Sequence, residues 1–119
     1  MQTNEETLME LAYRYFTRKG FNIDFNVEMK RDDGKKQNVD MVVTDKAGNK
    51  IGVLVVNWDR SIGVNVIRKL SRIVHGTPLK DGIIIGVTFS EHSRRFAKDY
   101  EVQLLSKSKI RFNMEELYY

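Results

Sequence analysis

The sequence predicts an α/β (α+β) domain in which a central mixed β-sheet is flanked by helices. Apolar residues recur at helical spacing in three segments, and five other segments alternate or run as short apolar strands. Three of the strands come in succession and helices separate the later ones, which favours a meander followed by parallel crossovers. The expected order is α-β-β-β-α-β-α-β, and a chain of 119 residues is expected to form one domain over residues 1–119.

The first half of the chain predicts one helix and three strands. The helix begins at a capping box of Thr3 and Glu6 and stops at Gly20. Residues 21–30 alternate between apolar and polar side chains, which is typical of a half-buried strand. Two further strands are expected at about 37–44 and 51–58, and the second of these is apolar on both faces, which predicts a central position in the sheet.

The second half predicts two crossover helices and two strands. A helix follows Ser61, with Ile67, Leu70 and Ile73 on its buried stripe. A buried strand at 82–87, a helix capped by Ser90 and a short strand at 102–105 complete the order. Helices are therefore expected on both faces of the sheet.

Composition narrows the classes of function. The chain contains no cysteine and no apolar run of the roughly 20 residues needed to cross a bilayer, so disulfides, thiolate metal sites and a membrane span are not expected. A polar N-terminus makes a cytoplasmic protein the default. The net charge of +4 favours an anionic partner such as nucleic acid only mildly.

Asp40 lies in the apolar strand Val39-Asp40-Met41-Val42-Val43, and thirteen residues separate it from Leu54 on the next strand. The helix of residues 61–70 and the closing strand-helix-strand of residues 82–105 follow in order. This order and spacing resemble the restriction-endonuclease-like (PD-(D/E)XK) superfamily, in particular its Mrr-like branch of DNA endonucleases. The resemblance covers most of the chain.

The resemblance implies a site at Asp40, Leu54 and Val56. The family places a metal-binding aspartate at Asp40, a glutamate or glutamine at Leu54 and a lysine at Val56. Residues two apart on a strand face the same way, so the pair would point into one site. Leucine and valine cannot bind a hard cation or orient water for attack on a phosphate. Asp40 is then either a hydrogen-bonded structural aspartate or a residual metal ligand.

Three functions remain open. The preferred one is a nuclease fold that binds DNA or another nucleic acid without cleaving it, or that serves as a non-catalytic subunit of a DNA-processing assembly. The second is an active Mg²⁺-dependent endonuclease with relocated residues Glu10, Glu28, Asp40 and Lys30; the family's first-helix carboxylate would fall at Met9 or Glu10. No cofactor is expected unless this second function holds. The third is a protein-interaction module on the same scaffold.

Clustered cations are the candidate phosphate contacts, because binding to a nucleic-acid backbone requires little more than positive charge. The preferred residues lie on the first hairpin and on the helix after Ser61: Lys30, Arg31, Lys35, Lys36, Arg68, Lys69 and Arg72. Trp58 is expected to line the core or a groove, with base stacking as the alternative. The alternating first strand and the Tyr118-Tyr119 tail would suit a homodimer or a partner protein.

Overall fold

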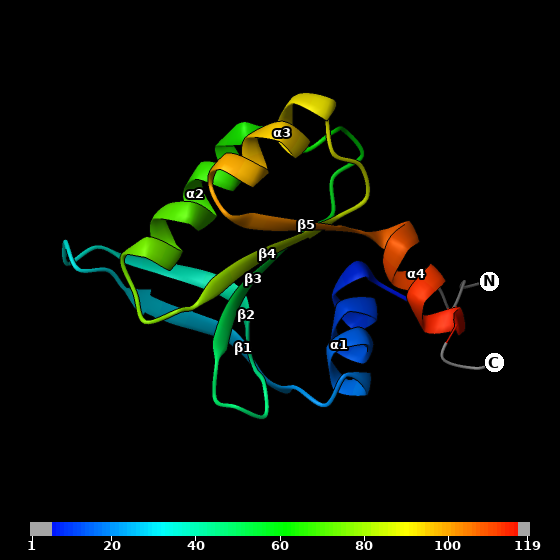
Figure 1. The fold of residues 1–119 in the computed structure, drawn as a ribbon, viewed down its shortest axis with the longest axis horizontal. Helices are drawn as coiled ribbons and strands as arrows, with labels where there is room; N and C mark the ends of the chain where they lie inside the picture. The colour runs from blue at the N-terminus through cyan, green and yellow to red at the C-terminus, as the bar shows by residue number, and fades with distance from the viewer. Residues whose placement is uncertain (1–5, 117–119) are drawn as a thin grey trace, which may run out of the picture.

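The computed structural model describes residues 6–116 and confirms a mixed sheet between two layers of helices (Figure 1). The elements are α1 (Leu8–Arg18), β1 (Asn22–Lys30), β2 (Lys36–Thr44), β3 (Lys50–Val56), α2 (Val64–His75), β4 (Asp81–Gly86), α3 (Glu91–Asp99), β5 (Val102–Ser106) and α4 (Lys107–Glu116). The expected order is present, with α4 as an additional final helix. Within the described residues, no helix is long and apolar enough to cross a membrane.

The five strands lie side by side in the order in which they occur along the chain. β1, β2 and β3 form an antiparallel meander, whereas β3, β4 and β5 are parallel to one another. β3 is therefore the central strand, as its two apolar faces predicted. β1 and β5 are the two edges, and the carboxyl ends of the three parallel strands meet at one end of the sheet.

Each face of the sheet carries its own hydrophobic core. α1 and α4 cover one face, where Phe16 packs with Met41 and Val53. α2 and α3 cover the other face, where Leu70 packs with Ile84. Ser93 is buried in this second layer and donates its hydroxyl hydrogen to the carbonyl of Ile62 over 2.8 Å.

The start of α1 differs from the prediction. Thr7, not Thr3, is the N-cap: its Oγ1 accepts the Glu10 N–H over 3.0 Å, and the Glu10 carboxylate accepts the Thr7 N–H over 3.1 Å. The chain offers the same Thr-x-x-Glu pattern twice, but the apolar stripe begins only at Leu8. An earlier start would add a turn with nothing to bury. Thr3 itself lies outside the described residues.

β1 and β2 bend sharply halfway along their length, which the alternating sequence did not predict. Met41 packs on the α1 side of the sheet, but Val27 and Val39 pack on the α2 side. Residues 39 and 41 would share a face in a regular strand. The change of face coincides with Asn26, whose φ of 53° is left-handed, a conformation that asparagine tolerates better than most residues.

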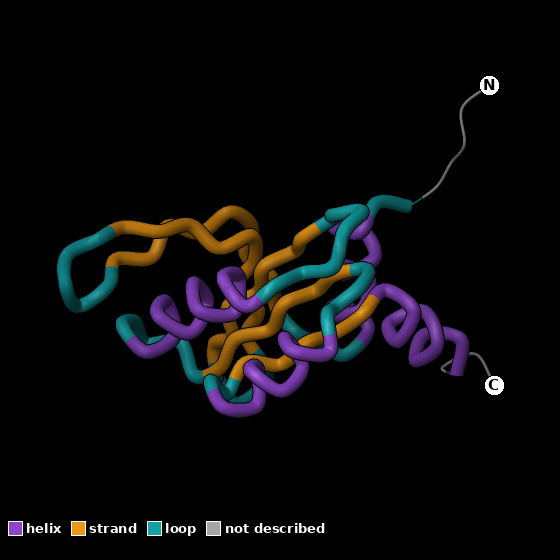
Figure 2. The backbone as a smooth tube through the Cα atoms, turned by 90° about the horizontal axis from the view of Figure 1, so that it is seen from above, coloured by secondary structure: helices purple, strands orange, loops and turns teal. Residues whose placement is uncertain are grey.

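The bend sends the β1–β2 hairpin away from β3 and towards the end of α2 (Figures 1 and 2). The Asp32 N–H donates to the carbonyl of Gly76, just after α2, over 2.9 Å. The outer half of the hairpin therefore forms an arm that is held against α2, while the inner half belongs to the main sheet.

Candidate functional site

Asp40 stands where β2 and β3 part. The antiparallel ladder between these strands ends at Met41 and Val53. Beyond that point the Asp40 carboxylate oxygen Oδ2 accepts the Val55 N–H over 2.7 Å. The half-buried carboxylate thus satisfies an amide of the central strand that the ladder no longer serves. Such a hydrogen bond is expected if Asp40 is a structural aspartate rather than a metal ligand.

Leu54 and Val56 lie on the α2 side of the central strand. Leu54 is only 6% exposed and belongs to the core formed with Ile67 and Ile84. Val56, near the end of β3, is half-buried against the same core. Neither side chain carries a donor or acceptor, so the face that the resemblance assigned to catalysis is hydrocarbon.

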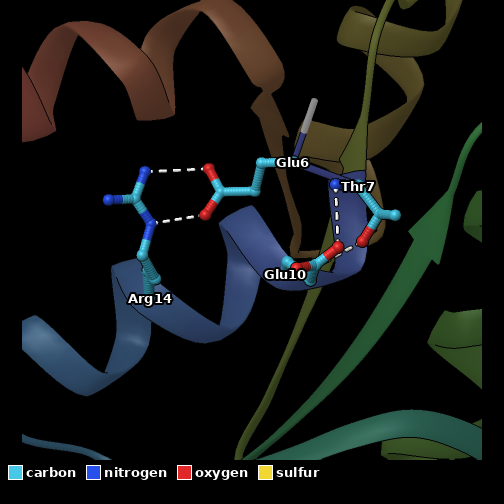
Figure 3. A network of polar contacts seen from close by, with 4 residues as sticks. All are labelled: Glu6, Thr7, Glu10 and Arg14. Carbon is cyan, nitrogen blue, oxygen red and sulfur yellow. Dashed lines mark hydrogen bonds and ion pairs between the residues drawn. The ribbon is translucent and has the colours of Figure 1, made fainter. Parts of the chain in front are cut away.

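The candidate relocated carboxylates Glu10 and Glu28 have other partners, and those of Glu10 are drawn in Figure 3. Glu10 closes the capping box of α1, and the hydrogen bonds from the Thr7 backbone and then from its side chain lower the pKa of the Glu10 carboxyl. Its neighbour Glu6 accepts a hydrogen bond from Arg14 over 2.8 Å. Glu28, on the outer arm, lies 3.6 Å from the Lys36 ammonium. Among the described residues, Glu10 and Glu28 thus have partners other than Asp40, although Glu28 lies on β1 opposite Asn38, two residues along β2 from Asp40.

The donor set does not fit a Mg²⁺ site. Within residues 6–116, no group of three or more His, Cys, Asp or Glu side chains is placed to hold a metal ion. Mg²⁺ requires near-octahedral oxygen ligation and usually takes at least one or two carboxylates. Where β2 and β3 part, Asp40 offers one carboxylate, and its oxygen Oδ2 accepts the Val55 amide.

The cations of the hairpin are largely offset by nearby carboxylates. Residues 28–36 contain four cations and three carboxylates. The Arg31 side chain is 14% exposed and paired with Asp33, and this hydrogen bond is the main cause of a lowered pKa for the Asp33 carboxyl. Lys36 faces Glu28, which leaves Lys30 and Lys35 as the exposed cations outside these two ion pairs. The hairpin therefore offers little net positive charge.

The surface of α2 and α3 is more strongly cationic. Their two segments, residues 64–75 and 91–99, contain six cations and two carboxylates. Arg68, Lys69 and Arg72 are exposed on α2, and the Arg68 guanidinium lies 5.1 Å from the ring centroid of Phe96 on α3. This contact joins the two helices into one surface, which we call the α2–α3 surface.

A second cationic region lies at the carboxyl end of the parallel strands; the sequence shows Lys107, Lys109 and Arg111 as a basic cluster, but it does not show that they lie near Arg60. After β3, the Arg60 guanidinium stacks 4.5 Å from the centroid of the Trp58 ring. After β4 and β5, Val87, Lys107, Ser108, Arg111 and Phe112 line a hollow of about 430 Å³. The grouping was hidden because α4 was not predicted; the signals for this helix were the spacing of Ile110 and Met114, and also Ser106, whose Oγ accepts the Lys109 N–H over 3.2 Å.

The fold and the position of Asp40 beside the central strand define a restriction-endonuclease-like domain. A family model for restriction endonucleases, Mrr_cat, matches residues 1–112, and the chain therefore belongs to this family. This confirms the resemblance drawn from the spacing of Asp40 and Leu54. No curated protein matches the sequence.

Three solved structures share the fold. A protein of unknown function, AF1548, is 16% identical with a TM-score of 0.75, over 85% of this chain and 58% of that one. A repair endonuclease from Pyrococcus abyssi is 16% identical with a TM-score of 0.62, over 89% and 49% of the two chains. EndoMS in its apo form is 15% identical with a TM-score of 0.58, over 89% and 48%. The chain thus spans about half the length of the solved proteins it matches.

Proposed function

We propose that this domain binds DNA through phosphate contacts and does not cleave it by the metal-dependent chemistry of its family. One observation carries the proposal: the two positions that should bear a carboxylate or amide and a lysine are Leu54 and Val56, and Leu54 is buried in the core. A hydrocarbon strand can neither hold Mg²⁺ nor stabilise charge on a scissile phosphate.

The remaining polar groups support this reading. The Asp40 carboxylate oxygen Oδ2 accepts the Val55 amide, Glu10 closes the cap of α1, and Glu28 lies beside the Lys36 ammonium. A relocated centre would need at least two carboxylates and a lysine that converge. The partners of Glu10 and Glu28 support the absence of such a centre.

The α2–α3 surface is the better candidate for phosphate binding. It has a larger excess of cations than the hairpin arm, and backbone binding depends on clustered charge rather than on base contacts. The chain belongs to a restriction endonuclease family, and one structural neighbour is named as a repair endonuclease. Both names point to DNA as the partner.

Salt-dependent binding to a labelled duplex tests this function. Affinity should fall steeply as salt rises and should show little sequence preference. Arg68→Ala with Arg72→Ala should lower the slope of log affinity against log salt by about 2, roughly one for each lost contact. The matched control is Lys46→Ala with Lys50→Ala, which removes the same charge from exposed positions near the β2–β3 turn.

The control double variant distinguishes binding by the α2–α3 surface from binding that depends only on the net charge of the protein. If both double variants weaken binding equally, the protein is merely basic and the α2–α3 surface is not the interface. If no duplex is bound even at low ionic strength, the DNA-binding proposal fails. The same duplex should remain intact in the presence of Mg²⁺ or Mn²⁺.

A second candidate function, a subunit that docks on a partner protein or on a second copy, is favoured by a groove between α1 and the edge strand β1. The groove holds about 400 Å³ and is lined in part by Met9, Tyr13 and Phe25. Tyr13 and Phe25 are 44% and 51% exposed, and their tilted rings pack with centroids 5.5 Å apart. Light scattering over a concentration series, with Tyr13→Ser and Phe25→Ser as variants, tests self-association there.

A further inference from the structure

We infer that the carboxyl end of the parallel strands is a binding site for unpaired nucleotides, with Trp58 and Phe112 as stacking surfaces and Arg60, Lys107 and Arg111 as phosphate contacts. The inference rests on the proposed function, because it names the form of nucleic acid that the domain takes. We call this region the carboxyl-edge site.

The three loops of the carboxyl-edge site are neighbours in space. Val56 pairs with Gly86 at the ends of β3 and β4, so the chain leaves both strands at the same level. The Ile62 N–H donates to the Thr88 carbonyl over 2.9 Å, which holds the loop after β3 beside the loop after β4. Val87 in turn lines one hollow with Lys107, Arg111 and Phe112 of α4.

Charge in this region is positive. Residues 57–61, 87–90 and 106–112 contain four cations and one carboxylate, Asp59. An anionic ligand would therefore be attracted here rather than repelled. α4, which supplies Lys107 and Arg111, lies at the opposite end of the sheet from the hairpin tip (Figures 1 and 2).

Two exposed aromatic rings, Trp58 and Phe112, lie in this region; the α2–α3 surface carries one exposed ring, Tyr100, which is stacked on Phe96. Phe112 is 60% exposed and Trp58 is 36% exposed, although burial of either ring would be favourable. Rings beside a cationic track are the pattern used to bind single strands, because every base has a face that stacks and every nucleotide carries a phosphate. Bases in a duplex are already stacked on each other, so a duplex gains nothing from these rings.

The contact between Arg60 and Trp58 is weak enough for a nucleotide base to replace the guanidinium on the indole ring. An exposed cation–π contact is among the weaker interactions of an aromatic ring, and base–aromatic stacking is stronger. An incoming base could therefore replace the Arg60 guanidinium on the indole. The released guanidinium would remain within reach of the adjoining phosphate.

Trp58 is the one tryptophan in the sequence, so its fluorescence reports on this site alone. The experiment titrates the wild-type protein with single-stranded DNA of about 12 nucleotides, which is within the usual site size. A duplex of the same length and a single strand of the same length that lacks its bases serve as matched controls. An RNA strand of equal length shows whether the sugar matters.

We expect the base-containing single strands to quench Trp58 emission and to bind at least about tenfold more tightly than the abasic strand. Trp58→Ala should weaken single-strand binding by roughly 5- to 100-fold, as measured by the anisotropy of a labelled strand, and should leave duplex binding unchanged. Trp58→Phe should retain most of the affinity, because it retains a ring. Phe112→Ala should act in the same direction as Trp58→Ala.

The outcomes separate this inference from the proposed function. Duplex binding with unchanged Trp58 emission and no preference for single strands would overturn the carboxyl-edge site and leave the proposed function standing. Equal binding and quenching by the abasic strand or by polyglutamate would also overturn it, because the region would then be a general anion or acidic-protein surface. Failure of every nucleic acid to bind would remove both. If Trp58→Ala does not fold, the wild-type titration against the abasic strand decides alone.

Discussion

Restoring the family's catalytic pair should destabilise this protein rather than activate it. The perturbation is Leu54→Glu with Val56→Lys, which places the expected carboxylate and ammonium at the two positions on β3. Leu54 is 6% exposed and packs in the core beneath α2 and α3, whereas Val56 is half-buried near the end of the strand. The two changes should therefore have very different costs.

The cost of Leu54→Glu can be estimated from its burial. Removing a buried leucine forfeits about 1.5–3 kcal/mol of transfer free energy, and an unpaired buried charge brings the total to at least about 3–5 kcal/mol. For a domain of this size, that loss should lower the melting temperature by about 12–20 °C. Val56→Lys alone should cost much less, because a lysine stem can extend along the apolar surface to reach water.

Thermal and urea unfolding of the wild type, Leu54→Glu, Leu54→Gln and Leu54→Met measure these costs. Leu54→Met conserves volume and should cost less than about 1.5 kcal/mol. Leu54→Gln has the shape of the glutamate without its charge. Comparing the glutamate and glutamine variants as a function of pH therefore isolates the charge.

Burial should raise the pKa of the introduced glutamate in the folded state. The two variants should then be equally stable below the unfolded pKa of about 4.3, and the glutamate variant should lose stability as the pH rises through its folded pKa. The gap can grow by up to about 1.4 kcal/mol per pH unit. Equal stability of the two variants at neutral pH, or a glutamate variant that melts like the wild type, would show that the position is open to water and that the reasoning is wrong.

Three further predictions concern particular hydrogen bonds. Asp40→Ala should lower the free energy of unfolding, measured in urea, by about 1–3 kcal/mol, because the Val55 N–H loses its acceptor. Asp40→Asn should recover part of this loss. An alanine variant as stable as the wild type would show that Asp40 has no structural role. Hydrogen bonds from the Asn49 side chain and backbone lower the pKa of the Asp45 carboxyl, so its contribution should be present above about pH 4 and be lost as the pH falls through the lowered value. Asp45→Asn should abolish that part of the acid dependence, and an unchanged acid limb in a urea series would contradict it. Thr7→Ala should cost about 1 kcal/mol through the lost N-cap, as measured by thermal unfolding, and a cost near zero would place the helix start elsewhere.

Periodicity was sufficient to predict most of the fold. Three patterns each predicted one type of element. The apolar stripe of α2 predicted a helix, the two apolar faces of β3 predicted a central strand, and Ser90 predicted the start of α3. All three elements are present. α4 was not predicted because its described buried residues are Ile110 and Met114 alone, and apart from the exposed Phe112 the other side chains of the segment are polar. Two apolar residues four apart do not distinguish a helix from a polar tail.

The bend at Asp40 could not be predicted from alternation. Phe25, Val27 and Met29 alternate with polar residues as though one face were buried throughout, yet Phe25 is 51% exposed and the other two pack on the opposite side of the sheet. A single left-handed residue, Asn26, is enough to exchange the faces. Sequence spacing could place Asp40 beside β3, but it could not show that the carboxylate accepts the Val55 amide.

Cleavage of DNA in the presence of metal tests the central claim most directly. Purified protein is incubated with labelled single-stranded, duplex and branched DNA, with Mg²⁺ or Mn²⁺, and strand integrity is read on a denaturing gel. The account predicts intact strands under conditions in which a parallel native gel shows that the duplex is bound. Metal-dependent cleavage that disappears in Asp40→Ala, a change that would not affect a contaminating nuclease, would contradict it and show that the catalytic groups have moved rather than vanished.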